Sequence, residues 1–180
     1  PEQFDGFRPW LVSDMLTIAA AEAGGLYARN SPDSALRRLA DRKSKRVLYL
    51  DDMTTYIKAI AAQPERVQLR AFSDAVKHID KLPASMKTVN RAWLVGDIDR
   101  IERELLRPAQ AKSPEIYKAI FTDRDAKWAD RLDRFLQSGQ KGMAIVGVGH
   151  LIGKDGLPER LRARGYDVTR VRRIDLPNDE

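Results

Sequence analysis

The sequence predicts an α/β fold: a helix-rich single domain, residues 1–180, around a small, mainly parallel sheet with a C-terminal βαβ unit. Short apolar runs at 47–50 and 143–148 contain β-branched residues and are typical of buried strands. Helical periodicity extends over almost all of residues 64–137. The order strand, helix, strand over 143–174, with a short crossover, predicts the βαβ unit, which is normally right-handed.

Composition places the chain among globular proteins and excludes several kinds of site. Hydrophobic residues make up 43% and charged residues 32% of the 180 residues, which is typical of a chain that buries a core. No apolar run approaches the roughly 20 residues needed to span a bilayer, so no transmembrane segment is expected. The absence of cysteine excludes disulfides, thiolate nucleophiles and cysteine metal sites.

The positive charge is concentrated in two stretches. Residues 29–46 hold seven basic and two acidic side chains, and residues 154–173 hold seven basic and three acidic ones, within a chain of net charge +6. Aromatic residues are not interleaved with these stretches as they are in base-stacking platforms. Two interpretations stay open: a solvated basic face, or a surface for an anionic partner such as nucleic acid or lipid headgroups.

The first helices have clear start and stop signals. Proline favours the first turn of a helix, so one helix is expected to begin at Pro9 and to end at Gly24–Gly25. A second is expected after Ser31, the predicted N-cap, with Pro32 in its first turn. The long helical region then shows breaks at Gly96–Asp97 and Arg107–Pro108 and a further predicted N-cap at Asp123.

Two adjacent carboxylates, Asp51 and Asp52, follow the expected strand 47–50. One of them could simply cap the next helix, whose apolar residues recur at helical spacing from Met53 to Ile60. Alternatively, both lie at the carboxyl end of a strand, which is where ligands bind in open α/β sheets. The sequence leaves these two alternatives open.

The second candidate site is the glycine-rich segment 142–156, in which an expected strand ends at His150. Gly147 and Gly149 do not complete a dinucleotide fingerprint, because the next glycine is Gly153, one position late. No glycine-flanked serine nucleophile is present. Histidine and aspartate are ordinary ligands of Zn²⁺ or Mn²⁺, but a catalytic metal needs about three protein ligands. Since the chain has two histidines and His78 lies in a polar helical stretch, the ligand set is short.

Five motifs in order along the chain are similar to those of the TraB/GumN family, within the Tiki and erythromycin-esterase-like group. The resemblance covers most of the chain. One such motif alone would be weak evidence for the family, but five in the same order are specific to it. They are Pro9-Trp10, the run from Val47 to Asp51, Trp93-Leu94-Val95-Gly96-Asp97, Arg124-Asp125-x-x-Trp128, and Gly147-Val148-Gly149-His150-Leu151-x-Gly153-x-x-Gly156.

The resemblance implies a mixed α/β fold and, for the Tiki branch, metal-dependent proteolysis. It implies that His150 is a metal ligand or catalytic group and that Asp51 occupies an acidic metal-binding position. It also implies that Arg124 contributes a positive charge to the same cleft. Gly147 and Gly149 are the expected cofactor-binding backbone, and the cofactor is a divalent metal, Zn²⁺ or Mn²⁺. Relatives often carry export leaders, so a periplasmic or exported location is expected.

Two departures from the family pattern bear on activity. The first Gly-x-x-His motif has no counterpart here, so the N-terminal part of the family fold is expected to be missing from residues 1–180. Asp51 replaces the usual glutamate, which shortens its reach by one methylene. The leading hypothesis is a hydrolase or peptidase acting on a peptide or small molecule. The alternative is a non-catalytic binding or regulatory protein whose basic surface meets an anionic partner.

Overall fold

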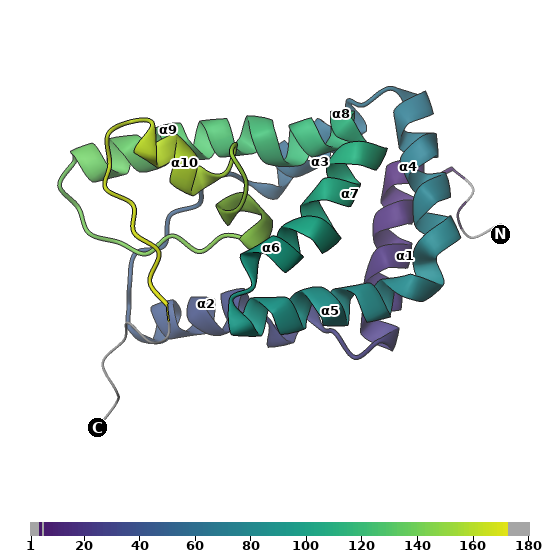
Figure 1. The fold of residues 1–180 in the computed structure, drawn as a ribbon, viewed down its shortest axis with the longest axis horizontal. Coiled ribbons are helices and arrows are strands. Elements are labelled where there is room, and N and C mark those ends of the chain that lie inside the picture. The colour runs from purple at the N-terminus through teal and green to yellow at the C-terminus, as the bar shows by residue number, and fades with distance from the viewer. Residues whose placement is uncertain (1–3, 5, 173–180) are drawn as a thin grey trace.

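The computed structural model describes residue 4 and residues 6–172, and over this part of the chain the protein is a helical assembly (Figure 1). The α-helices are α1 (Pro9–Ala23), α2 (Pro32–Arg42), α3 (Met53–Ala61), α4 (Glu65–His78), α5 (Leu82–Val95), α6 (Ile98–Ile101), α7 (Arg107–Lys112), α8 (Pro114–Tyr117), α9 (Asp123–Gln137) and α10 (Leu157–Arg162). Short 3₁₀ turns are η2 (Ala28–Asn30), η3 (Ile79–Lys81) and η6 (Val148–Leu151), and π segments are η4 (Glu102–Leu106) and η5 (Lys118–Thr122).

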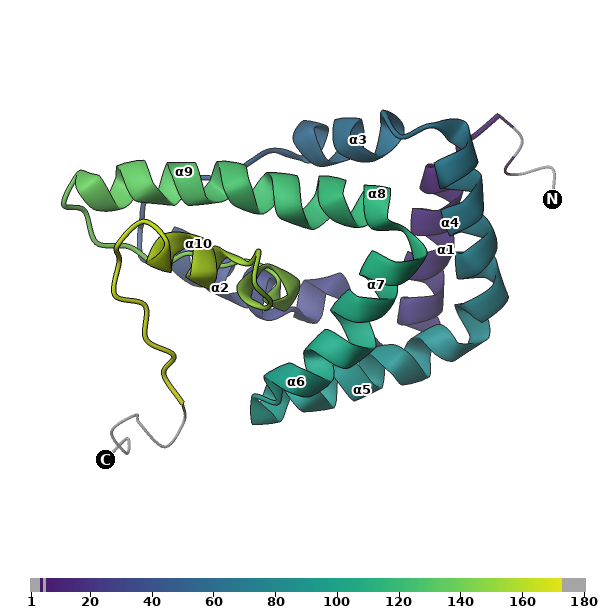
Figure 2. The same ribbon diagram turned by 45° about the horizontal axis from the view of Figure 1, so that its top comes forward.

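The predicted parallel sheet and βαβ unit are wrong: residues 4 and 6–172 contain no strand. The expected strand segments 47–50, 143–147 and 166–172 run as irregular chain, on the side of the molecule away from α1 and α4 in both views (Figures 1 and 2), and Val148 begins η6. Backbone hydrogen bonds do not join these segments to one another. A β-strand requires hydrogen bonds to a neighbouring strand, and the β-propensity of a local segment does not provide that neighbour. The last two residues of the expected strand 166–174 lie outside the described part.

Several predicted helix boundaries are confirmed by their capping contacts. The Ser31 hydroxyl accepts a hydrogen bond from the Ser34 N–H at 3.2 Å and begins α2. Gly96 ends α5 in the left-handed conformation, with φ of 71°, where a side chain would be strained. The turn after α10 contains Gly165, whose φ of 88° is also left-handed.

Two predicted boundaries in the helical region are wrong, and π segments explain both. Helix α6 continues through η4 into α7, so Pro108 falls in the first turn of α7 instead of ending a helix. Helix α8 continues through η5 into α9, and Asp123 has helical φ and ψ of −75° and −33° instead of those of an N-cap. A π segment widens one turn and so lets a helix continue past a local conflict.

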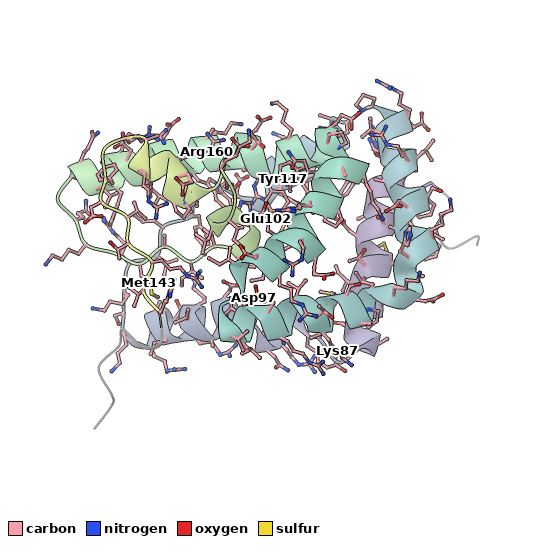
Figure 3. All side chains as sticks on the ribbon, viewed as in Figure 1. Lys87, Asp97, Glu102, Tyr117, Met143 and Arg160 are labelled. Carbon is pink, nitrogen blue, oxygen red and sulfur yellow. The ribbon has the colours of Figure 1, made fainter. Side chains whose placement is uncertain are left out.

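Two clusters of buried side chains position the segment that contains His150. Ile152 belongs to the first cluster and Leu157 to the second, so residues 148–157 pass from one to the other. Arg160, labelled in Figure 3, secures the far end of this segment by donating to the Asp155 carbonyl at 2.7 Å and to the Thr122 carbonyl at 3.1 Å. The buried members are Ala92, Ile101, Leu106 and Ile152 in the first cluster, and Trp128, Ala129 and Leu157 in the second.

Helix α2 lies along the edge of the molecule without a buried residue (Figure 1). Arg38 and Arg42 are exposed on it, and Leu39 on the same helix is 42% exposed. The basic stretch found in the sequence is therefore a surface feature of this helix and of the residues that follow it. Within residues 4 and 6–172, no helix is long and apolar enough to cross a bilayer.

Candidate functional site

His150 is buried and held by a carboxylate. It lies in η6, and its Nδ1 is 2.6 Å from Oδ1 of Asp125 on α9. The two residues are 8% and 2% exposed. Because an ionised carboxylate can only accept hydrogen bonds, Nδ1 carries the proton and donates it to Asp125. In the neutral form of the ring, the other nitrogen, Nε2, carries the lone pair.

Two aromatic rings fix the plane of the His150 imidazole. The Phe121 ring centroid lies 5.0 Å from that of His150, and the Trp128 centroid lies 4.5 Å from it, both in tilted arrangements. Phe121, Asp125 and Trp128 are spaced by four and three residues, which places them on one face of the helix that runs from η5 into α9. One helix face therefore supplies both the hydrogen bond and the two rings.

Arg124 and Asp51 form an ion pair next to this group. Arg124 Nε donates to Asp51 Oδ2 at 2.9 Å, and Nη2 lies 3.5 Å from Oδ1. The guanidinium carbon also lies 4.5 Å from the centroid of the Trp128 ring and 5.6 Å from that of Tyr56, as in cation–π contacts. Trp128 thus contacts Arg124 as well as His150.

Of the two adjacent aspartates, one caps a helix and the other lies in the candidate site. Asp52 caps α3, since its carboxylate accepts from the Thr55 N–H at 2.7 Å and from the Thr55 hydroxyl at 2.8 Å. These hydrogen bonds stabilise the ionised form and hold the pKa of Asp52 below its usual range. Asp51, one residue earlier, is instead the partner of Arg124.

Arg124 and Asp51 open onto a shallow depression with a volume of about 820 Å³. Tyr49, Asp52, Met53, Thr55, Tyr56 and Arg131 complete its lining. His150 does not line this depression. The three predicted site residues are therefore joined through Trp128: Arg124 and Asp51 directly, and His150 from a separate, buried position.

Asp125 is the site residue that the sequence analysis missed. It stands inside the Arg124-Asp125-x-x-Trp128 motif, of which only Arg124 is predicted to lie in the site. The signal that could have found it is its position three residues before Trp128, on the face of a helix expected to be buried. A carboxylate on such a face requires a partner, and a histidine elsewhere in the chain is a natural one.

The predicted metal site of His150 and Asp51 receives no support from the arrangement of these residues. Arg124 engages both Asp51 oxygens, and residues 4 and 6–172 hold no group of three or more His, Asp or Glu side chains that could bind a metal ion. His150 has the donor chemistry of a metal ligand, because its second nitrogen is tied to a carboxylate. The carboxylate oxygens of Asp51, the predicted second ligand, are both in contact with Arg124 instead.

The two glycines assigned to a cofactor differ in their surroundings. A Cβ atom added at Gly149 would lie 2.7 Å from Cε1 of Phe121 and 3.3 Å from Cδ2 of Leu106. At Gly147 the nearest atom would be Cδ2 of His150, at an ordinary 3.7 Å. Gly149 is therefore needed for the close packing of η6 against the ring that faces His150.

This difference predicts unequal effects of two matched substitutions. Gly149→Ala should displace Phe121 and lower the free energy of unfolding by about 1–3 kcal/mol, the usual effect of overpacking. Gly147→Ala should leave stability within about 0.5 kcal/mol of the wild type, because its new methyl group meets no close neighbour. Chemical denaturation of both variants is the measurement. Equal stability of the two would contradict the packing described here.

Comparison with known proteins gives the chain a family. A family model described as the TraB/PrgY/gumN family matches residues 1–170. No curated protein and no solved structure matches the chain. The match covers nearly the whole sequence and includes all five motifs on which the predicted resemblance rests. The protein with this buried His150–Asp125 pair therefore belongs to the TraB/PrgY/gumN family.

Proposed function

We propose that this protein is a hydrolase of the peptidase type, in which His150 is the catalytic group and Asp125 positions it. The observation that supports the proposal is the buried hydrogen bond between His150 Nδ1 and Asp125. A neutral imidazole fixed in one tautomer is a ready general base at neutral pH. The Arg124 guanidinium, on the other contact of Trp128, supplies a positive charge nearby.

The proposed reaction is attack of water on a carbonyl carbon. His150 Nε2 takes one proton from the attacking water, and the oxygen of that water forms the new bond to carbon. The Asp125 carboxylate stabilises the imidazolium that results. His150 then returns the proton to the leaving nitrogen as its bond to carbon breaks, so the products are an acid and an amine.

Arg124 has the role of holding a negative charge of the substrate. Its Nε and Nη2 are directed to Asp51, and its Nη1 lies 3.4 Å from the Ile120 carbonyl. The side chain is 15% exposed and lines the depression next to Tyr56. A guanidinium so fixed can bind a carboxylate of the substrate or a developing oxyanion without further ordering of its own side chain.

Substitution of each histidine tests the proposal. The probe is fluorescein-labelled casein, whose cleavage releases fluorescence. His150→Gln should lower the rate by about 10²- to 10⁴-fold, the usual contribution of a general base. Asp125→Asn should lower it as well, because an amide can donate to Nδ1 as well as accept from it and so no longer fixes the tautomer. His78→Gln is the matched control and should have no effect, since His78 is exposed and, among the described residues, bonds only to Asp74 on its own helix.

Further measurements separate catalysis from folding. Thermal unfolding followed by circular dichroism establishes that each variant is folded. The ¹⁵N shifts of His150 should show a single tautomer with protonated Nδ1 in the wild type, and loss of that preference in Asp125→Asn. An unchanged rate in folded His150→Gln would refute the proposal, and so would the absence of casein cleavage by the wild type.

A divalent metal, Zn²⁺ or Mn²⁺, enters the proposal only at His150. Because Asp51 is committed to Arg124, we assign no step to a metal. Titration with either ion, followed by calorimetry, should show binding that His150→Ala abolishes and that Asp51→Asn and His78→Ala leave within about twofold, since Nε2 is the available donor. If His150→Ala binds metal as well as the wild type does, the metal part of the proposal is wrong. Casein cleavage tests the general base independently of that result.

A second candidate function is binding to anionic lipid, and the exposed basic helix α2 favours it. Arginines and an exposed leucine on one helix are typical of segments that lie on a charged membrane surface. Vesicles that contain phosphatidylserine should bind the protein, whereas phosphatidylcholine alone should not. Binding should weaken as salt rises, because surface charges become screened.

Charge reversal on two surfaces provides the matched control. The double variant Arg38→Glu/Arg42→Glu should lose vesicle binding, because about 1 kcal/mol of attraction is lost for each basic residue near the surface. Arg91→Glu/Arg103→Glu changes the net charge equally at exposed residues of α5 and η4 instead of α2, and should bind nearly as the wild type does. Equal loss in both double variants would show that net charge, and not this helix, is responsible.

A further inference from the structure

A second cavity lies between the N-terminal helices and the helices that follow Pro108. It has a volume of about 350 Å³, within the range of small-molecule sites. Residues of α1, α3 and α4 form one side of it, and residues of α7, α8 and η5 form the other. Tyr117, labelled in Figure 3, lies on the second side and packs against Phe121, with ring centroids 5.1 Å apart.

Gln68 presents a buried acceptor in this cavity. Its side chain is almost completely enclosed, since the residue is 3% exposed. The amide Nε2 donates to the Gln63 carbonyl at 2.7 Å and lies 3.5 Å from the Ala61 carbonyl. These contacts fix which end of the amide is nitrogen, because a carbonyl can only accept. Oε1 is then left buried without a hydrogen-bond partner among the described residues.

Two more polar groups line the cavity beside Gln68. The Trp10 indole N–H is also buried without a partner in the described part of the chain. Asp14, one turn further along α1, forms no ion pair among the described residues. Burial raises the pKa of Asp14, and its hydrogen bond to Tyr56 acts in the opposite direction. Folding therefore keeps a carboxylate in a position that disfavours its charge.

The charges and walls of the cavity define the ligand that fits it. Two acceptors, the Asp14 carboxylate and Gln68 Oε1, require N–H or O–H donors. Lys112, the cation among the lining residues, is already paired with Asp74 at 3.1 Å. The carboxylates of Asp14 and Asp74 repel anions. The remaining walls are largely apolar or aromatic and include Ile60, Ile116, Ile120 and Phe121.

We propose that this cavity binds a small apolar molecule that carries a primary ammonium group, with the ammonium on Asp14 and Gln68. A primary ammonium offers three N–H donors and a positive charge, which satisfies both acceptors and makes the ionised form of Asp14 favourable. The indole of Trp10 and the ring of Tyr56 border the same space and provide faces for a cation. The apolar body of the ligand then lies against the isoleucines.

The test is a titration with 2-phenylethylammonium chloride, followed by two-dimensional ¹H–¹⁵N spectra. The indole N–H signal of Trp10, assigned with Trp10→Phe, should shift, whereas that of Trp93 on α5 should not. Asp14→Asn should weaken binding by at least about tenfold, since a charge-assisted hydrogen bond is lost. The uncharged isostere 2-phenylethanol should bind more weakly than the ammonium by a similar factor.

The matched control is Asp33→Asn, which removes an exposed aspartate from α2 and should bind the ammonium as the wild type does. Asp14→Asn should fold, because it removes the charge that burial disfavours, and its spectrum shows this directly. Absence of any shift at Trp10, equal binding of the alcohol, or unchanged binding in Asp14→Asn would each overturn the proposal. None of these outcomes depends on whether His150 is catalytic.

Discussion

The hydrogen bond between His150 and Asp125 is the contact on which the C-terminal half of the protein depends. It joins two buried side chains, and a buried carboxylate or imidazole without a partner would be destabilising. It joins the glycine-rich segment, which has little regular structure of its own, to α9, the longest helix in that half. The two hydrophobic clusters on either side of this segment pack around that bond.

Much of the helical framework could be predicted from the sequence because its signals are local. Ser31, Pro32 and Gly96 determine helix ends through their own backbone and nearest neighbours, and the structure confirms them. The sheet could not be predicted correctly, because strand pairing depends on which distant segments meet. The β-branched runs near Val47 and Val146 have the composition of strands, but Leu50 and Val146 pack against the buried Trp128 cluster instead.

The candidate site was predictable in part for the same reason. His150, Arg124 and Asp51 stand in recognisable motifs, and the structure places Arg124 against Asp51 as an ion pair. The role of Asp125 depends on a contact across 25 residues, which no single motif contains. Neighbouring positions also have different roles: Asp52 caps a helix while Asp51 pairs with Arg124, and only the direction of each side chain distinguishes them.

The π segment η5 has a consequence for how this protein can change during evolution. It contributes Ile120 and Phe121 to the second cavity, and it separates Ile116 and Tyr117, which also border that cavity, from Asp125, which holds His150. A π turn accommodates one extra residue without breaking the helix, so the helix phase before it is not rigidly tied to the phase after it. Selection can therefore alter the cavity at Ile116, before η5, while Asp125 and Trp128 keep their contacts with the imidazole. One continuous helix thus serves both sites, which share Phe121.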